Sequence, residues 1–263
     1  MIIFVVTMAI FILGGGTGLI YWSNNQTSTV QTGQKDTGPS QDTVNLPTTT
    51  SVSPSATDTA NAITNQNPYV PGPSTLVMTD PLSSNNQKSQ WQENAQGSCQ
   101  FTNGSYHASA APNLLTTCFA TDTNYANFTY EIQMIFIKKA PKYSSGGIIF
   151  RGNSNQHQFY YFEVYASGRY ALQKCDRSGS CTILEGSPLD PPSPAYHIDQ
   201  INTIAVVANQ NRFTFYINQQ AVGSQQTDNT SQPYTQGMIG VLAHGGLPPA
   251  PPTEVAYSNI RVS

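Results

Sequence analysis

The chain has 263 residues, a formal net charge of −3, and only 10% charged residues. Ordinary soluble domains carry about 25% charged residues, so the polar surface here must consist mainly of Ser, Thr, Asn, Gln and Tyr. Because there is no excess of Lys and Arg to neutralise phosphates, the composition argues against nucleic-acid partners.

Residues 1–22 predict a transmembrane helix. The segment has no charged residue and ends in the aromatic pair Tyr21-Trp22, which suits a membrane interface. Its length just reaches the roughly 20 residues that a helix needs to span a bilayer. A cleaved signal peptide is the alternative, but no Lys or Arg precedes the apolar run and no clear small-x-small cleavage site follows it. We therefore expect an uncleaved single-pass anchor in the cell membrane. Since Lys35 is the first basic residue, it stays open whether a cytoplasmic part precedes Met1.

Residues 23–75 are dominated by Ser, Thr, Asn, Gln and Pro. Their few apolar residues follow no period, so the segment cannot bury enough surface to offset the entropy cost of ordering. We predict a disordered linker that holds a folded domain, residues 76–263, away from the membrane. The composition and the cysteines place this domain on the extracytoplasmic side.

Alternation of apolar and polar residues in residues 76–263 predicts an all-β domain. Residues 127–137 (NFTYEIQMIFI) alternate in this way over most of their length, as in a strand with one buried face. Many short strands at regular spacing are typical of a sandwich or a barrel. The predicted strands are residues 127–137, 147–151, 158–165, 169–173, 201–208, 212–217, 237–243 and 254–262.

The connections between these strands also have specific chemistry. Ser167-Gly168 suits a tight turn, and residues 209–211 (NQN) suit a hairpin because Asn tolerates left-handed backbone. The proline-rich segments 188–194 and 248–252 lack backbone donors, so we expect them outside the sheets.

The chain has four cysteines, and an even count in an exported domain favours disulfides. Of the three pairings, we favour the local one: Cys175–Cys181 closes a turn-rich loop, and Cys99–Cys118 ties the first β-hairpin region. Zinc binding is the alternative, but neither pair has the close C-x-x-C spacing of such sites.

A series of aromatic and glycine-rich motifs runs through most of residues 76–263. It includes Gly146-Gly-Ile-Ile-Phe-Arg151, Phe159-Tyr-Tyr-Phe-Glu163 and Tyr257-Ser-Asn-Ile-Arg261. The series resembles a bacterial exported domain of the concanavalin A-like lectin/glucanase superfamily, of the laminin-G-like and keto-disaccharide-hydrolase-like kind. The resemblance implies an antiparallel jelly-roll sandwich of two sheets behind a membrane anchor and a Ser/Thr-rich linker. This fold hosts lectins, glycosidases and adhesion modules alike, so it does not specify the function.

Residues 158–165 carry the candidate binding residues. Alternation places Tyr161, Glu163 and Tyr165 on one face, and it turns the opposite face, with Tyr160, Phe162 and Val164, towards the core. Aromatic rings beside hydrogen-bonding groups can stack on sugars, and Glu131 and Arg151 lie on strand faces that could extend such a site. The alternative is cross-strand aromatic packing with an Arg–Glu pair. If the face binds a glycan, Tyr161→Ala should abolish binding and leave stability nearly unchanged.

Catalytic motifs are weak in this sequence. Retaining glycoside hydrolysis needs two carboxyl groups about 5–5.5 Å apart, and no strand carries closely spaced acids. Glu131 and Glu163 could meet only if their strands were neighbours. There is also no nucleophile-elbow motif for Ser/His/Asp catalysis. We therefore assign no catalytic residues and lean towards a protein that is not an enzyme.

Metal sites are equally weakly indicated. The four histidines are far apart in the sequence and form no ligand motif, so we assign no metal ligands and expect no cofactor. Structural calcium stays open, because loop carbonyls and single acids such as Asp122 or Asp228 can bind it.

Taken with the resemblance, these features favour a membrane-anchored, extracytoplasmic module that binds a glycan or cell-envelope polysaccharide without catalysis. A sensory or adhesive protein-interaction ectodomain is the alternative, and a glycoside hydrolase is the second alternative. The sequence indicates no oligomeric state.

Overall fold

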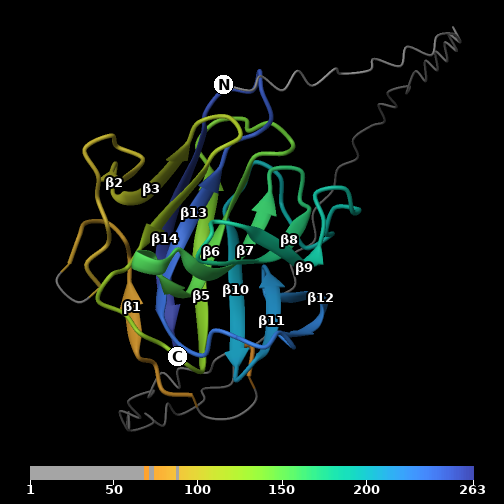
Figure 1. Ribbon diagram of the computed structural model, residues 1–263. Helices are drawn as coiled ribbons and strands as arrows, with labels where there is room; N and C mark the ends of the chain where they lie inside the picture. Colours follow the sequence, from red (N-terminus) through yellow and green to blue (C-terminus); the bar gives the residue numbers. More distant parts are fainter. Residues whose placement is uncertain (1–67, 71–73, 87–88) are drawn as a thin grey trace, which may run out of the picture. The chain divides into compact units, whose positions relative to one another are not determined.

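The computed structural model describes residues 68–70, 74–86 and 89–263, which all fall in one compact unit of the chain, residues 60–263 (Figure 1). The predicted transmembrane helix, residues 1–22, lies outside the described residues, as does most of the predicted linker, residues 23–75. Both stay predictions. Within the described residues, no helix is long and apolar enough to cross a membrane.

The described domain consists of two antiparallel sheets, as the all-β prediction required (Figure 1). The eight-stranded sheet has the order β12-β11-β10-β5-β14-β3-β2, with β1 also paired to β14, and the six-stranded sheet has the order β4-β13-β6-β7-β8-β9. Among the described residues the only helix is the short 3-10 turn η1 (Ser154–Gln156). The strands are β1 (Met78–Asp80), β2 (Cys99–Thr102), β3 (Ser105–Ala110), β4 (Leu115–Phe119), β5 (Phe128–Phe136), β6 (Ser145–Asn153), β7 (Gln158–Tyr165), β8 (Tyr170–Cys175), β9 (Cys181–Gly186), β10 (Asn202–Asn209), β11 (Arg212–Ile217), β12 (Gln220–Thr227), β13 (Met238–His244) and β14 (Thr253–Val262).

Side-chain alternation explains how the two sheets build one core. In β5, Tyr130, Ile132 and Met134 are buried in the main cluster, and Glu131 between them points out of the sandwich. Large aromatic side chains fill the space between the sheets, and the hydroxyls of Tyr130 and Tyr257 find backbone partners there. The Tyr257 hydroxyl, for example, donates to the Leu242 carbonyl at 2.5 Å and accepts from the Gly147 amide at 2.8 Å.

The connections follow the predicted chemistry with one difference. Gly168 takes the left-handed backbone (φ 83°) in the turn between β7 and β8, and both proline-rich segments lie outside the strands. The β10–β11 hairpin also forms. Its left-handed residue is Gln210 (φ 52°), whereas Asn was expected to take that role.

Both predicted disulfides are present, and one of them has a wider reach than expected. Cys175–Cys181 joins the neighbouring strands β8 and β9. Cys99–Cys118 joins β2 to β4, which are the edge strands of different sheets. This bridge therefore fastens the two sheets to each other at one edge of the sandwich and does not simply tie a hairpin.

Candidate functional site

The outward face of β7 carries most of the predicted binding residues. Tyr161, Glu163 and Tyr165 point away from the main core, as alternation predicted, and Tyr160, Phe162 and Val164 lie inside it. The outward residues are nevertheless only 0–5% exposed. Tyr161 belongs to a second apolar cluster on this side of the sheet, with Phe119, Ile149, Phe159, Cys175 and Leu242. The face is thus a packed surface with little aromatic area open to a ligand.

Glu163 is the polar centre of this surface. Its carboxylate accepts hydrogen bonds from Ser145 Oγ at 2.5 Å, Tyr165 Oη at 2.5 Å and Gln173 Nε2 at 2.6 Å. His244 Nδ1 lies 3.5 Å away. These groups come from the neighbouring strands β13, β6, β7 and β8. A buried carboxylate supplied with this many donors is well satisfied and holds the sheet together.

Glu131 does not lie on this surface, so the expectation that it extends the β7 face is wrong. Glu131 lies on β5 in the other sheet, where it accepts a hydrogen bond from the Tyr69 hydroxyl. Because Glu131 and Glu163 point out of different sheets of one sandwich, the core separates their carboxylates. They cannot form the closely spaced pair that retaining hydrolysis requires.

Arg151 does not extend the β7 face either, because it is 1% exposed. Its guanidinium donates to the Ala126 carbonyl through Nη2 at 2.6 Å and to the Tyr234 carbonyl through Nη1 at 2.9 Å. It also lies over the ring of Phe213, 5.2 Å from its centroid. Among the described residues, Arg151 forms no ion pair with a glutamate. Arg151 instead anchors the loop that carries Tyr234, and that loop borders a pocket.

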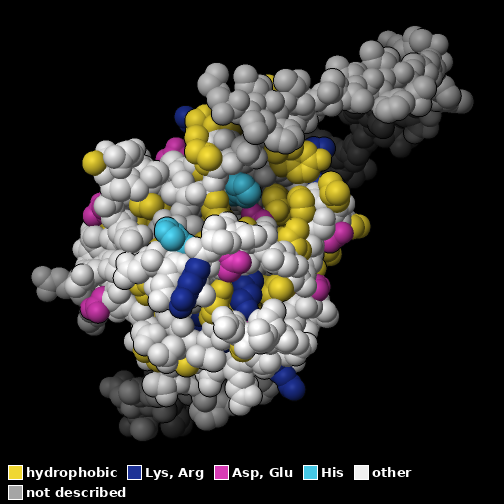
Figure 2. Space-filling view, viewed as in Figure 1, with side chains coloured by type: hydrophobic (Ala, Val, Ile, Leu, Met, Phe, Trp, Pro, Cys, Tyr) yellow, Lys and Arg dark blue, Asp and Glu magenta, His cyan; other side chains and the backbone are white. Residues whose placement is uncertain are grey.

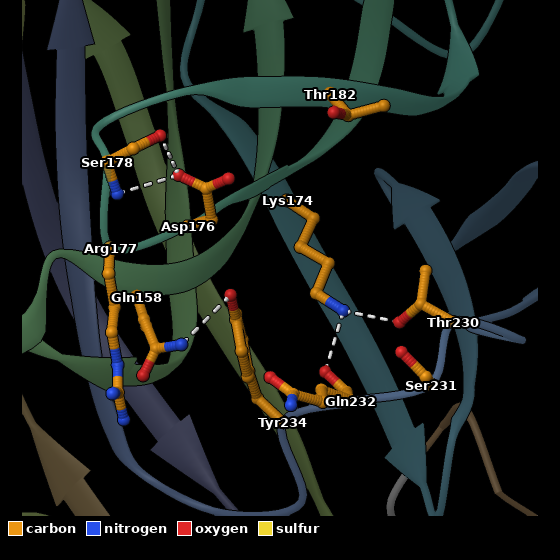
Figure 3. Close-up of a pocket in the computed structure, with 10 residues that line it drawn as sticks. All are labelled: Gln158, Lys174, Asp176, Arg177, Ser178, Thr182, Thr230, Ser231, Gln232 and Tyr234. Atoms are coloured by element: carbon orange, nitrogen blue, oxygen red, sulfur yellow. Dashed lines mark hydrogen bonds between the residues drawn. The ribbon is translucent and has the colours of Figure 1, made fainter.

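This pocket, which we call the Tyr234 pocket, lies between the β8–β9 hairpin and the loop that connects β12 to β13 (Figure 3). Its volume is about 600 Å³, within the range of small-ligand sites. Figure 3 shows Gln158, Arg177 and Tyr234 on one side and Lys174 on the other. The pocket is lined by Gln158, Lys174, Asp176, Arg177, Ser178, Thr182, Thr230, Ser231, Gln232 and Tyr234.

A hydrogen-bond network fixes the Tyr234 side of the pocket. The Tyr234 amide donates to Tyr160 Oη at 3.0 Å, and the Tyr234 hydroxyl donates to the Cys175 carbonyl at 2.9 Å. Together with the bond from Arg151, these contacts hold the Tyr234 backbone and the tip of its ring. Such preorganisation lowers the entropy cost of binding a ligand.

Lys174 lines the pocket beside Tyr234, with its Nζ 4.7 Å from the centroid of the Tyr234 ring, and pairs with the buried Asp228. Lys174 Nζ donates to Asp228 Oδ2 at 2.8 Å, to Thr230 Oγ1 at 2.6 Å and to the Gln232 carbonyl at 2.9 Å. Burial by itself raises the pKa of the Asp228 carboxyl, but hydrogen bonds from Lys174, Thr230 and Tyr160 outweigh it and lower the pKa to about 2. The ion pair therefore persists at neutral pH.

The charges around the pocket balance. Lys174 is paired with Asp228, and Arg177 and Asp176, which both line the pocket, carry opposite charges. Hydrogen bonds from the Ser178 hydroxyl and amide lower the pKa of Asp176, which keeps it ionised. Charged side chains are few on the face of the molecule that Figure 2 shows. A balanced polar pocket of this kind suits a neutral ligand with many hydroxyl groups better than an anion.

Sequence reasoning missed this pocket because its lining comes from three separate stretches of chain. The nearest signals were the Cys175–Cys181 loop and the polar run of residues 228–236, and neither shows that the two segments meet. The described part of the chain contains no group of three or more His, Cys, Asp or Glu side chains that could hold a metal ion. Asp228, which the sequence left open as a calcium ligand, forms an ion pair with Lys174.

Comparison with known proteins places this geometry in a family. Residues 82–263 match the model of the 3-keto-alpha-glucoside-1,2-lyase-like domain. The chain belongs to this family. The membership confirms the predicted resemblance to concanavalin A-like, glucanase-type sandwich domains. No curated protein matches the sequence significantly.

Several solved structures are similar to this 3-keto-alpha-glucoside-1,2-lyase-like domain at low identity. A mutant of the GH43 protein BlXynB from Bacillus licheniformis is 11% identical, with a TM-score of 0.50 over 70% of this chain and 38% of that one. The carbohydrate-binding module CBM66 from Bacillus subtilis is 14% identical, with a TM-score of 0.49 over 66% of this chain and 92% of that one. The β-glucanase of Bacillus licheniformis is 14% identical, with a TM-score of 0.46 over 71% of this chain and 97% of that one. The likeness to the GH43 protein concerns the fold alone.

Proposed function

We propose that residues 76–263 form a glycan-binding module whose ligand site, the Tyr234 pocket, binds a glycan without catalysis. The observation that carries this proposal is the pocket itself. Its volume is about 600 Å³, its charges balance, and hydroxyl and amide groups surround one tyrosine ring. An aromatic face with a few well-placed polar groups is the usual composition of a specific small-ligand site.

The lining suits a saccharide in particular. Gln158 and Thr182 supply an amide and a hydroxyl on β7 and β9, and Arg177 adds guanidinium donors from the turn between β8 and β9. A sugar ring presents hydroxyls that both donate and accept, together with an apolar C–H face that can pack on the Tyr234 ring. Family membership supports the same ligand class, because the family is named for a lyase of a keto-glucoside.

We further propose that the module works on the outer side of the cell membrane. Two disulfides support this placement, because such bridges persist in oxidising compartments. Held there by residues 1–22 and the linker that follows, the pocket would meet envelope polysaccharides.

A binding screen of the full chain against cell-wall polysaccharides and defined oligosaccharides tests the proposal. Arg177→Ala and Gln158→Ala should each weaken binding at least about 10-fold, which corresponds to about 1.4 kcal/mol, because each removes hydrogen bonds to the ligand. Arg212→Ala is the matched control, since Arg212 is an exposed arginine on β11 outside the pocket. Binding that responds equally to all three variants, or no binding to any saccharide, would refute the assignment.

A further inference from the structure

Three polar side chains on the other sheet form a chain of hydrogen bonds that the Tyr234 pocket does not use. Ser105 Oγ lies 2.9 Å from His107 Nε2, and His107 Nδ1 lies 2.7 Å from Glu254 Oε1. Ser105 and His107 are two residues apart on β3, so both point out of the sheet while Tyr106 between them enters the core. Glu254 comes from β14, which pairs with β3 (Figure 1).

The order of these contacts assigns the proton positions. An ionised carboxylate can only accept, so Glu254 takes the hydrogen of His107 Nδ1. In the neutral ring this leaves Nε2 as an acceptor, and Nε2 faces the Ser105 hydroxyl. The Thr102 carbonyl also lies near that hydroxyl, at 3.4 Å, but the histidine is closer. Both short distances fall within the range of about 2.6–3.2 Å expected for a nucleophile, its base and the group that orients the base.

The three residues also line a hollow in which a substrate could bind. Its volume is about 590 Å³. Ser105, His107 and Glu254 line it together with three isoleucines, one on β5, one just after β5 and one just before β10. Ile137 and Ile201 are 42% and 55% exposed. Exposed apolar side chains beside a candidate nucleophile provide a place for an apolar acyl chain.

We propose that Ser105, His107 and Glu254 form a serine-hydrolase site for carboxylic esters with a short apolar acyl group. In the first step Ser105 Oγ bonds to the ester carbonyl carbon while its proton passes to His107 Nε2. The C–O bond to the alcohol then breaks, and the alcohol leaves with that proton. In the second step water attacks the acyl-serine, gives a proton to His107, and releases the acid, while the proton returns to Ser105.

Glu254 is a positioning residue in this scheme, because it touches His107 and not the ester. Its carboxylate holds the ring in the tautomer that accepts from serine and stabilises the imidazolium that forms during each step. The side chain is partly exposed, so its replacement leaves no buried unpaired charge. Glu254→Gln should therefore lower kcat with little change in KM, and Glu254→Asp should restore part of the loss.

The purified full chain is the material for the test, with p-nitrophenyl butyrate as substrate and an alkyl fluorophosphonate as covalent probe. The probe should add to the tryptic peptide that contains Ser105, and Ser105→Ala should abolish both labelling and hydrolysis. His107→Gln should lower both at least about 100-fold. Ser224→Ala is the matched control, because Ser224 is an exposed serine on β12 that does not line the hollow. A thermal unfolding midpoint for each variant separates misfolding from lost chemistry.

The outcomes distinguish this site from the proposed glycan pocket. Arg177→Ala should weaken saccharide binding and leave ester hydrolysis unchanged, and Ser105→Ala should do the reverse. If Ser105 stays unlabelled and the folded Ser105→Ala variant hydrolyses the ester as fast as the parent chain, the three side chains are only a structural hydrogen-bond chain. Labelling at another serine would overturn the assignment in the same way.

Discussion

Tyr161 points away from the main core, yet only 3% of it is exposed. It packs in the apolar cluster on the outer side of the six-stranded sheet, with its ring centroid 5.9 Å from that of Phe159. Tyr161→Ala should therefore lower the free energy of unfolding by about 2–4 kcal/mol, because it leaves a cavity among packed rings. Denaturant unfolding followed by fluorescence measures this loss.

Tyr143→Ala is the control for that experiment, since Tyr143 lies in the β5–β6 connection and contacts Lys142 through its ring. It should change stability by less than about 1 kcal/mol. The sequence alone led to the opposite expectation for Tyr161, namely lost binding at unchanged stability. An unfolding free energy for Tyr161→Ala equal to that of the parent chain would restore the earlier interpretation.

Asp228 makes stability depend on pH in the acid range. Its pKa is about 2 in the folded chain and about 3.9 when unfolded, so folding favours the ionised form. This stabilisation, on the order of 2 kcal/mol, is complete above about pH 5 and disappears as the pH falls towards 2. Asp228→Asn should remove it, which predicts a smaller drop in the unfolding midpoint between pH 6 and pH 3 than in the parent chain.

The other carboxylates titrate in both proteins, so the difference between the two pH profiles isolates Asp228. Parallel profiles would show that the ion pair with Lys174 does not contribute to stability in this way.

Sequence reasoning treated Asp228 as a lone acid, because Lys174 lies 54 residues away and nothing in the local pattern connects them. Alternation along β6 predicted that Arg151 would point out of the sheet, and this is wrong. The backbone is left-handed at Arg151 (φ 50°), and the register of β6 against β7 shifts beside it, so alternation does not hold at this residue.

At the scale of elements, Gly147 on β6 sits directly opposite Glu163 on β7. A Cβ at Gly147 would lie 2.2 Å from the Phe162 carbonyl oxygen and 2.8 Å from the Glu163 Cα, and both of these are backbone atoms that cannot turn aside. Gly147→Ala should therefore force β6 and β7 apart and lower the unfolding free energy by about 3 kcal/mol or more. Thermal and denaturant unfolding of the variant measure this effect.

Gly246→Ala is the matched control, because its Cβ would meet only side-chain atoms and a loop methyl group at 3.0–3.3 Å. It should cost much less than Gly147→Ala. Equal losses from both variants would mean that the close approach of β6 and β7 is not the cause.

The strands that the sequence predicted are those with a clear apolar period. All eight predicted segments are strands, and residues 158–165 and 212–217 have the predicted bounds. No bounds were predicted for the edge or near-edge strands β3, β4, β9 and β12, because much of their outward surface is polar, as in β12 (QAVGSQQT). Such strands form because a neighbour offers backbone partners, and that information is not local to their own sequence.

At the scale of the whole molecule, the sequence predicted the class of fold and both disulfide pairs, but not which elements the bridges join. Two sheets that share one core have open edges, and Cys99–Cys118 closes one of these by linking β2 to β4. Cys175–Cys181 instead shapes the turn that carries Asp176, Arg177 and Ser178 into the Tyr234 pocket. The two bridges therefore have separable tasks.

Removing each bridge should show that separation. The Cys99→Ala/Cys118→Ala variant should lose about 3 kcal/mol of unfolding free energy, because it frees a longer loop, and should keep saccharide affinity while folded. The Cys175→Ala/Cys181→Ala variant should lose about 2 kcal/mol. It should also bind saccharide more weakly, because the turn with Arg177 must then be ordered on binding. Unfolding curves and titrations on both variants measure the two effects.

An unchanged affinity in the second variant would mean that the turn is rigid without its bridge, since hydrogen bonds from Ser178 and Ser180 to the Asp176 carboxylate already close it.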